Sequence, residues 1–327
     1  MSMGNWHPRA TRWSLAASLS LTLTAGLVGC GGTKEGSVDT AVVTVNEPSA
    51  KSSAAAPAAG ETSPPAAPAE TTPAATPAPA EATTAAAPAA GGAEGWGTLK
   101  GRVVLNGEAP VLKAMYLKGD KSVKDPGICA GSSDILDERL VVDPASKGVR
   151  YAVVYIPKPT KVSPEAESAA KAQEVVFDQK NCTFVPHVLA FMKGTKVKIK
   201  SSDAAGHNVN TQSGLNNNKF NLPTQPMGEM DQLFKQAENK PGKVVCDIHG
   251  WMSAYMLVAS NPYFAVTDAN GNFEIKNVPA GDQKVVVWAE GLGPGFVTAP
   301  AGDVVAIKAD GETTQDFTLE SAKLKLK

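Results

Sequence analysis

The sequence has little histidine and little cysteine, the residue types that most often bind transition metals. Its 327 residues include four of each, so every one of them can be considered individually. Charged residues nearly cancel, with a net charge of −1 at pH 7, and this balance gives no electrostatic attraction toward nucleic acid. Hydrophobic residues make up 43% of the chain, which allows a folded core. A nucleic-acid partner is therefore not expected.

The N-terminal residues lack an apolar run long enough to cross a membrane, but they have the features of an export signal. Arg9 and Arg12 precede the apolar run SLAASLSLTLTAGLVGC, as in secretory signals. Its last letters, LVGC, resemble the lipobox of bacterial lipoproteins, in which the signal peptidase cuts before a cysteine that becomes diacylated. The resemblance implies a signal peptide over residues 1–29 and a lipid on Cys30. An ordinary cleaved signal beside an unrelated cysteine is the simpler alternative.

Bulky apolar residues are almost missing from residues 30–94. The stretch SPPAAPAETTPAATPAPAEATTAAAPAAGG consists mainly of Ala, Pro, Thr and Glu, a composition that cannot form a packed core. We expect a disordered linker, extended by its prolines, or a glycosylated stalk with the same mechanical effect. The protein would then be an exported, membrane-anchored lipoprotein that faces the periplasm or the cell surface. Gly31 does not mark inner-membrane retention as an aspartate could, which favours the outer membrane.

From residue 95 onward, helix-forming stretches are few and short β-branched stretches are many. The segments LKGRVVL, RYAVVYI, KVKIKSS, AYMLVAS, NFEIKNV and QKVVVWA are bounded by Gly, Pro, Asn or Asp, as strands are. A helix is expected only over residues 163–173, where Ser163 could cap it and Glu165 and Glu167 suit its first turn. Roughly 230 residues of this kind are enough for two β-sandwiches. The sequence therefore predicts an all-β protein.

Cysteine is too scarce for every thiol to find a partner. If Cys30 carries a lipid, Cys129, Cys182 and Cys246 remain in an oxidising compartment, and three thiols cannot all pair. One of them is therefore free and reactive, or is held by something other than a disulfide. The neighbours of Cys246 indicate what holds it.

The loop VVCDIHGWMSAYM, residues 244–256, places Cys246, His249 and Met252 three positions apart. One thiolate, two imidazoles and a weak axial thioether are the donors of a blue-copper electron-transfer site. The second imidazole must come from elsewhere. His207 in SSDAAGHNVN is the better candidate, because it follows the strand-like KVKIKSSD and precedes an asparagine. These residue types predict a copper site made of His207, Cys246, His249 and Met252.

The residues around these ligands resemble a cupredoxin. The run CTFVPHVLAFMKGTKVKIKSSDAAGHNVN, residues 182–210, is similar to the first half of that fold, and CDIHGWM is similar to the short ligand loop of amicyanin. The resemblance implies a Greek-key sandwich that holds one type 1 copper with the same four ligands. It also implies that Asn208 ties the two ligand loops together by hydrogen bonds. Electrons would leave at His249, which is expected at the surface beside Trp251.

The remaining cysteines and histidine have simpler expectations. With Cys246 on the metal, Cys129 and Cys182 are left as a pair, and a disulfide between them would contribute about 3–4 kcal/mol. His187 has no assigned role and is expected to be a polar residue that points off a strand.

Two other interpretations of the cluster stay open. Cys182 and His187, together with Cys246 and His249, would make a Cys2His2 zinc set, although this choice leaves Cys129 without a partner. A degenerate cupredoxin that binds no metal is the other interpretation.

A second resemblance involves both ends of the folded part. The stretch FAVTDANGNFEIKNVPAGDQKVVVWAE, residues 264–290, resembles carboxypeptidase regulatory or transthyretin-like domains, and GTLKGRVVLNGEAP, residues 97–110, resembles their first strand. The resemblance implies a smaller sandwich over residues 95–127 and 263–327, with the cupredoxin domain over 128–262. Exported proteins that pair these elements, some labelled methylamine-utilisation-like, are similar overall. Such relatives often have a histidine where Ala289 stands, which puts in doubt any role of that histidine here.

These observations predict a lipid-anchored electron carrier with one type 1 copper and a redox protein as its partner in the envelope. An enzyme is not expected, because four protein ligands leave no open position for a substrate, and the smaller sandwich shows no catalytic motif. One alternative is a copper-holding or copper-delivering factor with an exchangeable site. The other is a non-redox structural or binding lipoprotein that uses the cupredoxin as a scaffold.

Overall fold

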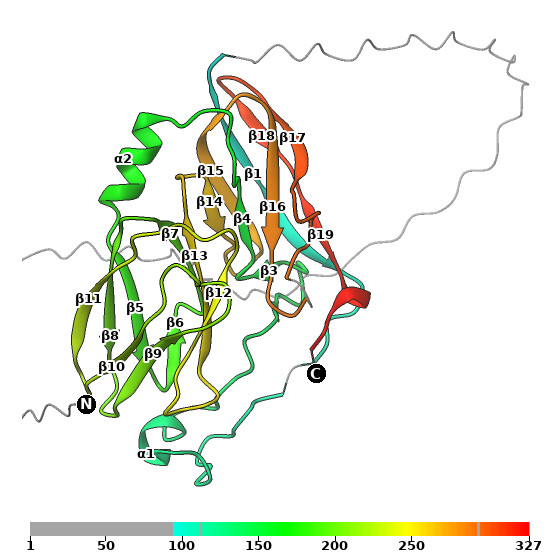
Figure 1. Cartoon of the computed structure of the whole chain (residues 1–327). Coiled ribbons are helices and arrows are strands. Elements are labelled where there is room, and N and C mark those ends of the chain that lie inside the picture. Colours follow the sequence, from blue (N-terminus) through cyan, green and yellow to red (C-terminus); the bar gives the residue numbers. More distant parts are fainter. Residues whose placement is uncertain (1–93, 112, 293–294, 327) are drawn as a thin grey trace, which may run out of the picture. The chain divides into compact units, whose positions relative to one another are not determined.

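The computed structural model describes residues 94–111, 113–292 and 295–326 (Figure 1). The predicted signal peptide, Cys30 and nearly all of the linker lie outside these residues. The described part is almost entirely β-structure arranged in sandwich-like pairs of sheets, which confirms the all-β prediction. None of its helices is long and apolar enough to cross a membrane.

The first sandwich lies on the left of Figure 1 and contains a five-stranded and a four-stranded sheet, in the orders β10-β9-β12-β13-β7 and β11-β8-β5-β6. Its strands are β5 (Val175–Lys180), β6 (Thr183–Val185), β7 (Val188–Met192), β8 (Lys196–Ser201), β9 (His207–Thr211), β10 (Asn221–Thr224), β11 (Glu229–Leu233), β12 (Gly242–Val245) and β13 (Ser253–Ala259). Alternation along β5 and β8 buries Phe177 and Ile199 between the two sheets, because successive side chains of a strand point to opposite faces.

The second sandwich joins residues from both ends of the described chain. Its strands are β1 (Trp96–Asn106), β4 (Val153–Tyr155), β14 (Phe264–Val266), β15 (Asn272–Pro279), β16 (Gly281–Trp288), β17 (Asp303–Ile307), β18 (Glu312–Thr314) and β19 (Phe317–Glu320). One sheet has β1 between β15 and the pair β18 and β19, and the other has the order β14-β4-β16-β17. Gly101 in β1 allows the backbone of Gln315 to approach closely, since a Cβ at this position would lie 1.9 Å from the carbonyl oxygen of Gln315.

Strand β4 departs from the predicted domain limits. It lies within residues 128–262, yet it pairs with β14 and β16 of the second sandwich. Val154 faces the core of that sandwich, while Val153 and Tyr155 face an apolar layer that also contains Leu257 of the first sandwich. Because both faces of β4 are buried, YAVVYI (residues 151–156) is a continuous apolar run that does not indicate which sheet it joins.

The helices are short and lie outside the sheets. The predicted helix is confirmed as α2 (Pro164–Ala172), and the side chain of Ser163 caps it by accepting a hydrogen bond from the backbone N–H of Ala166 at 3.3 Å. Helix α1 (Pro126–Cys129) was not predicted. The remaining elements are β2 (Val141–Val142), β3 (Val149–Arg150) and the 3-10 turn η1 (Ser321–Lys323).

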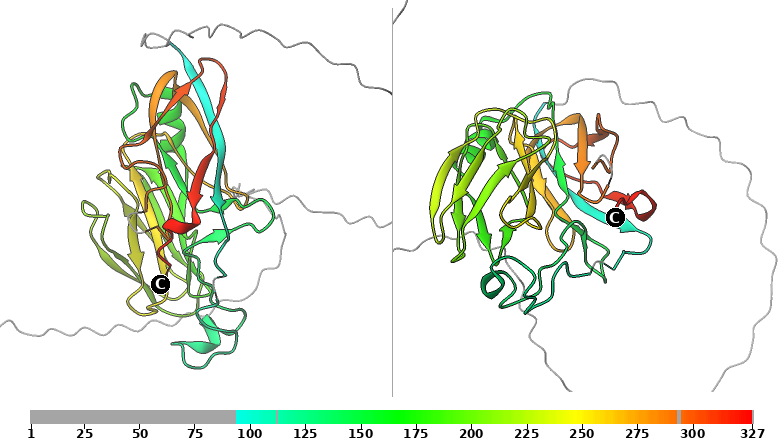
Figure 2. Two further views of the ribbon diagram at one scale, coloured as in Figure 1. Left: turned by 90° about the vertical axis from the view of Figure 1, so that its right-hand side faces the viewer. Right: turned by 60° about the horizontal axis from the view of Figure 1, so that its bottom comes forward.

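Residues 113–139, which we call the covering segment, lie against one end of the first sandwich, at the bottom of Figure 1 and toward the viewer on the right of Figure 2. This segment contains α1 and an isolated bridge between Tyr116 and Ile135. Val123, Cys129 and Ile135 are buried in the core of the first sandwich. Packing against that core therefore holds a segment that has almost no regular structure of its own.

Candidate metal centre

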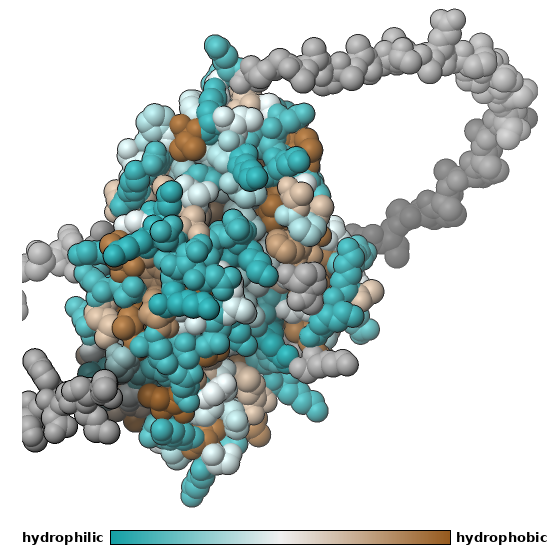
Figure 3. Space-filling model, in the orientation of Figure 1, coloured by the Kyte–Doolittle hydropathy of each residue, from teal (hydrophilic) through white to brown (hydrophobic). Residues whose placement is uncertain are grey.

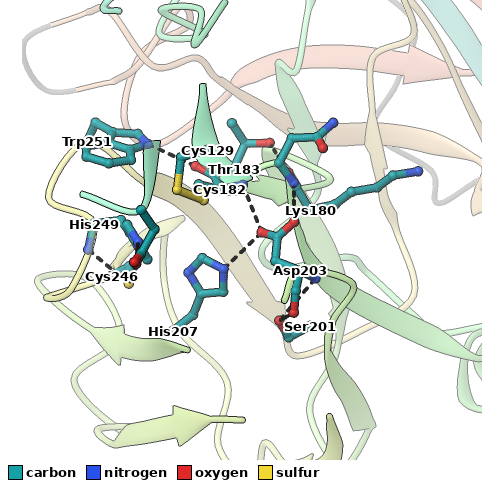
Figure 4. Close-up of a disulfide and its surroundings, with 12 residues drawn as sticks. Cys129, Lys180, Cys182, Thr183, Ser201, Asp203, His207, Cys246, His249 and Trp251 are labelled. Atoms are coloured by element: carbon teal, nitrogen blue, oxygen red, sulfur yellow. Dashed lines mark hydrogen bonds and ion pairs between the residues drawn. A yellow bond between two sulfur atoms is a disulfide. The ribbon is translucent and has the colours of Figure 1, made fainter. Parts of the chain in front are cut away.

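His207, Cys246 and His249 meet at the end of the first sandwich next to the covering segment (Figure 4). His207 begins β9 and Cys246 follows β12, and these two strands are hydrogen-bonded neighbours. The ligand atoms of the three residues lie within 4.8 Å of one another, and no residue of the three is more than 1% exposed. Nδ1 of His249 is 3.9 Å from Sγ of Cys246. Three of the four predicted ligands therefore form one buried cluster.

The loop from Cys246 to Met252 closes on itself through its backbone. The N–H of Met252 donates to the carbonyl of His249 at 2.9 Å, and the N–H of Cys246 donates to the carbonyl of Met252 at 3.2 Å. The N–H of His249 donates to Sγ of Cys246 at 3.4 Å. Met252, the fourth predicted ligand, is 2% exposed and belongs to the same buried core as Cys246. The short spacing thus builds a tight turn around the thiol.

Asn208 connects the two ligand loops. Its Oδ1 accepts a hydrogen bond from the backbone N–H of Asp247 at 2.8 Å and lies 3.3 Å from Sγ of Cys246. Its Nδ2 donates to Oδ2 of Asp247 at 2.9 Å. The carboxylate of Asp247 also accepts hydrogen bonds from Asn210 and Asn221. Asp247 is thus a second anchor of the loops, which the sequence analysis did not single out.

Each imidazole is held by a carboxylate through its Nε2 atom. Nε2 of His207 is 2.9 Å from Oδ2 of Asp203, and Nε2 of His249 is 3.0 Å from Oδ2 of Asp125. A carboxylate on one ring nitrogen orients the ring and leaves the other nitrogen as the donor for a metal. Sequence reasoning missed both carboxylates. Asp203 lies four residues before His207 and could have been noticed, whereas Asp125 has no local relation to His249.

The electrostatics of the cluster favour a thiolate. Burial would raise the pKa of Cys246, but the neighbouring side chains of His207 and His249 outweigh it and lower that pKa to about 5. Burial would likewise lower the pKa of His207, whereas Asp203 and Cys246 raise it to about 9. Both shifts favour the charged forms of the two side chains, a thiolate at Cys246 and an imidazolium at His207.

The residues present fit a soft or borderline transition metal. Among the described side chains, Nδ1 of His207 and Oε1 of Gln179 are the buried polar atoms without a hydrogen-bond partner. Leaving such an atom unpaired costs about 1–3 kcal/mol, and a bound cation would remove that cost for His207. One thiolate and two imidazole nitrogens are the donors of blue-copper centres. Copper is therefore consistent with both the unpaired atom and the donor types.

Cys129 and Cys182 form a disulfide beside this cluster. A ligand atom of His249 lies within 4.8 Å of both sulfur atoms, and Figure 4 shows the disulfide above the ring of His207. Nε1 of Trp251 donates to the carbonyl of Cys182 at 3.0 Å. The disulfide thus ties the covering segment to the strands that surround the metal centre.

His187 lies apart from the cluster and does not complete a zinc set. It is 4% exposed, with Nε2 at 2.6 Å from Glu290 and Nδ1 at 3.7 Å from Glu138. Because Cys182 is in the disulfide as well, the Cys2His2 alternative is not assembled. Ala289, the neighbour of Glu290, is buried in the core of the second sandwich and offers no ligand.

The expectation that His249 reaches the surface is wrong. Its side chain is 0% exposed, because Asp125 of the covering segment lies over its outer nitrogen. The ring of His249 is 5.3 Å from that of Trp251, and Trp251 meets Tyr116 edge-on at 5.2 Å. Both aromatic residues are only partly buried. Trp251 is therefore the aromatic neighbour through which His249 comes close to solvent.

No protein-family model and no curated protein matches the chain. Solved structures similar to part of it include a copper-containing nitrite reductase from Thermus scotoductus, with 18% identity, a TM-score of 0.24, and coverage of 26% of this chain and 22% of that one. A purple cupredoxin from Nitrosopumilus maritimus has 19% identity and a TM-score of 0.23, and the match covers 26% of this chain and 100% of the cupredoxin. An oxidised amicyanin mutant has 20% identity and a TM-score of 0.24, and the match covers 32% of this chain and 97% of the amicyanin. The chain thus spans about a fifth of the length of the nitrite reductase. The transthyretin-like resemblance of the second sandwich stays a prediction.

Proposed function

We propose that this protein is an exported single-copper electron carrier, anchored by a lipid on Cys30, that exchanges electrons with a redox protein of the cell envelope. The observation that carries the proposal is the convergence of one thiolate and two buried imidazoles whose Nε2 atoms are already bound to carboxylates. His207, Cys246, His249 and Met252 would hold the metal. Bound copper would supply one-electron exchange between its two common oxidation states.

The chain's own contribution is a set of buried donor atoms that hydrogen bonds hold in place. Asp203 and Asp125 orient the rings, and Asn208 fixes the loop that carries the thiolate. A frame that moves little suits a metal that changes only its charge. The four proposed ligands are buried and would leave no open position on the metal for a substrate, which supports a carrier and not an enzyme.

Electron exchange is proposed at Trp251, since His249 itself is covered. Tyr116 is in contact with Trp251, and its sequence neighbours Met115 and Leu117 are 42% and 65% exposed. Figure 3 shows apolar side chains at the lower end of the face on view, where α1 lies in Figure 1. An apolar surface next to a partly exposed aromatic ring suits brief contact with a redox protein.

The test is an absorption and electron paramagnetic resonance spectrum of the full-length protein with copper(II), recorded beside Cys246→Ser. We expect an intense visible thiolate-to-copper band and a narrow copper hyperfine pattern, both absent from the variant. A colourless wild-type protein, or one that binds only zinc, contradicts the carrier and leaves the scaffold alternative. Rapid copper exchange with chelators would favour the copper-delivering alternative.

The membrane anchor is tested separately. The mature protein should sediment with membranes and carry a diacylated N-terminal cysteine detectable by mass spectrometry, whereas Cys30→Ala should be soluble or unprocessed. An unlipidated wild-type protein would contradict the proposed anchor without affecting the copper site.

A further inference from the structure

The covering segment supplies a carboxylate to a site that is otherwise built by β-strands far away in the sequence. Oδ2 of Asp125 lies 3.0 Å from Nε2 of His249, 124 positions along the chain. The side chain of His249 is 0% exposed and that of Asp125 is 39% exposed. The carboxylate therefore reaches from the surface onto a buried ring.

Asp125 departs from the role that its place in the chain would give it. It is the N-cap residue of α1, where an aspartate side chain ordinarily accepts hydrogen bonds from the first backbone N–H groups of the helix. Here its side chain makes no such bond, and its backbone is left-handed with φ 52° and ψ 52°. The carboxylate contacts His249 instead. Departures from local rules of this kind are expected at functional positions.

The disulfide lies between the two residues whose carboxylates hold the imidazoles, Asp125 and Asp203. On one side, the N–H of Cys129 donates to the backbone carbonyl of Asp125 at 2.9 Å. On the other side, the N–H of Cys182 donates to Oδ2 of Asp203 at 2.8 Å, the same oxygen that lies 2.9 Å from His207. The disulfide and one hydrogen bond on each side of it thus connect Asp125 with Asp203.

We propose that Asp125 is a positioning residue for the second imidazole of the metal centre, and that the Cys129–Cys182 disulfide keeps it in place. By accepting the Nε2 proton of His249, Asp125 fixes the tautomer in which Nδ1 is the free donor beside Cys246. It also shields the ring from water. The assignment rests on the proposed copper site, but the tautomer and the shielding belong to the metal-free protein as well.

The first test measures copper(II) affinity in the full-length protein by competition with a chelator. Removing a group that orients a metal ligand typically weakens metal binding about 10- to 100-fold, and we expect that loss for Asp125→Ala. Asp125→Asn keeps an oxygen that can accept the proton, so its copper affinity should lie between those of the wild type and Asp125→Ala. The matched control is Asp120→Ala, because Asp120 lies in the same segment and, among the described residues, accepts hydrogen bonds from Ser122 alone. This control should bind copper as the wild type does.

The second test asks whether the disulfide acts through Asp125. A variant with Cys129→Ala and Cys182→Ala should lose copper affinity to a similar extent as Asp125→Ala. Adding Asp125→Ala to that variant should cause little further loss, because coupled residues are not additive. Additive losses would overturn the role given to the disulfide.

The third measurement uses the metal-free protein, so that it does not depend on the proposed function. The Nε2 proton of His249 should give a slowly exchanging imidazole signal by NMR in the wild type and in Asp120→Ala, and the signal should be lost in Asp125→Ala. If the wild type binds no copper, the proposed function fails while this signal still decides the role of Asp125. A wild-type signal and wild-type affinity in both Asp125 variants would overturn the inference.

Discussion

The two sandwiches have different interiors. The second has a core of aliphatic and aromatic side chains such as Leu99, Val154 and Phe273. The first also buries histidine and aspartate side chains, and His207, His249 and Asp203 are all at most 4% exposed. A buried polar atom without a hydrogen-bond partner is unfavourable, and Nδ1 of His207 is such an atom, so this arrangement does not serve stability alone. The difference identifies the first sandwich as the one that holds the candidate metal centre.

The largest effect is expected from breaking the apolar interior of the second sandwich. Phe273 is 5% exposed and packs against Phe317, so Phe273→Ala should lower the free energy of unfolding by about 3–5 kcal/mol, measured by urea denaturation. Val304→Ala on the exposed face of β17 is the control, since Val304 is 62% exposed. The copper spectrum of the folded Phe273→Ala protein should be unchanged, and a shifted visible band would show that the second sandwich shapes the metal centre.

Copper binding should protect the first sandwich from hydrogen exchange more than the second. A ligand that binds only the folded state at 100 times its Kd stabilises that state by about 2.7 kcal/mol. We expect hydrogen exchange, followed by mass spectrometry, to slow in β9 and β12 on adding copper(II), with little change in β1 and β15. Equal protection of both sandwiches would mean that they unfold as one unit, and the contrast between them would then concern chemistry and not stability.

Alkaline pH should act on the layer between the sandwiches. Burial raises the pKa of Tyr155 to about 12, and its hydroxyl donates to the carbonyl of Asn239 at 3.0 Å. A folded-state pKa above the unfolded value of about 10 gives stability that is complete below pH 10 and is lost as the pH rises toward 12. The loss should reach about 2 kcal/mol. Urea denaturation of Tyr155→Phe across this pH range should show a flatter profile, and a profile as steep as that of the wild type would contradict the assignment.

The sequence predicted the parts of the fold and site that depend on neighbouring residues. Strands such as β1 and β8 are visible as short β-branched runs, and the tight spacing of Cys246, His249 and Met252 shows donor atoms in one loop. The pairing of β4 was not predictable, because the sequence of a strand that is buried on both faces does not indicate which strand it pairs with.

The role of the covering segment was also beyond local patterns. This segment has almost no regular structure, and Asp125 meets His249 where the disulfide and buried residues such as Ile135 hold the segment on the core. For the same reason the sequence placed His249 at the surface. A contact between residues 124 positions apart leaves no periodic signal in either stretch.

The smallest effects are expected from replacing one buried polar residue in each sandwich. Gln283 of the second sandwich is 2% exposed and its Nε2 donates to Oγ1 of Thr160 at 3.0 Å, whereas Asn208 of the first binds the ligand loop. Gln283→Ala should lower the free energy of unfolding by about 1 kcal/mol and leave copper affinity unchanged. Asn208→Ala should lower copper affinity about tenfold, because the loop that carries the thiolate loses its link to β9. Equal effects of the two variants on chelator competition would contradict the view that only the first sandwich uses its buried polar groups for metal binding.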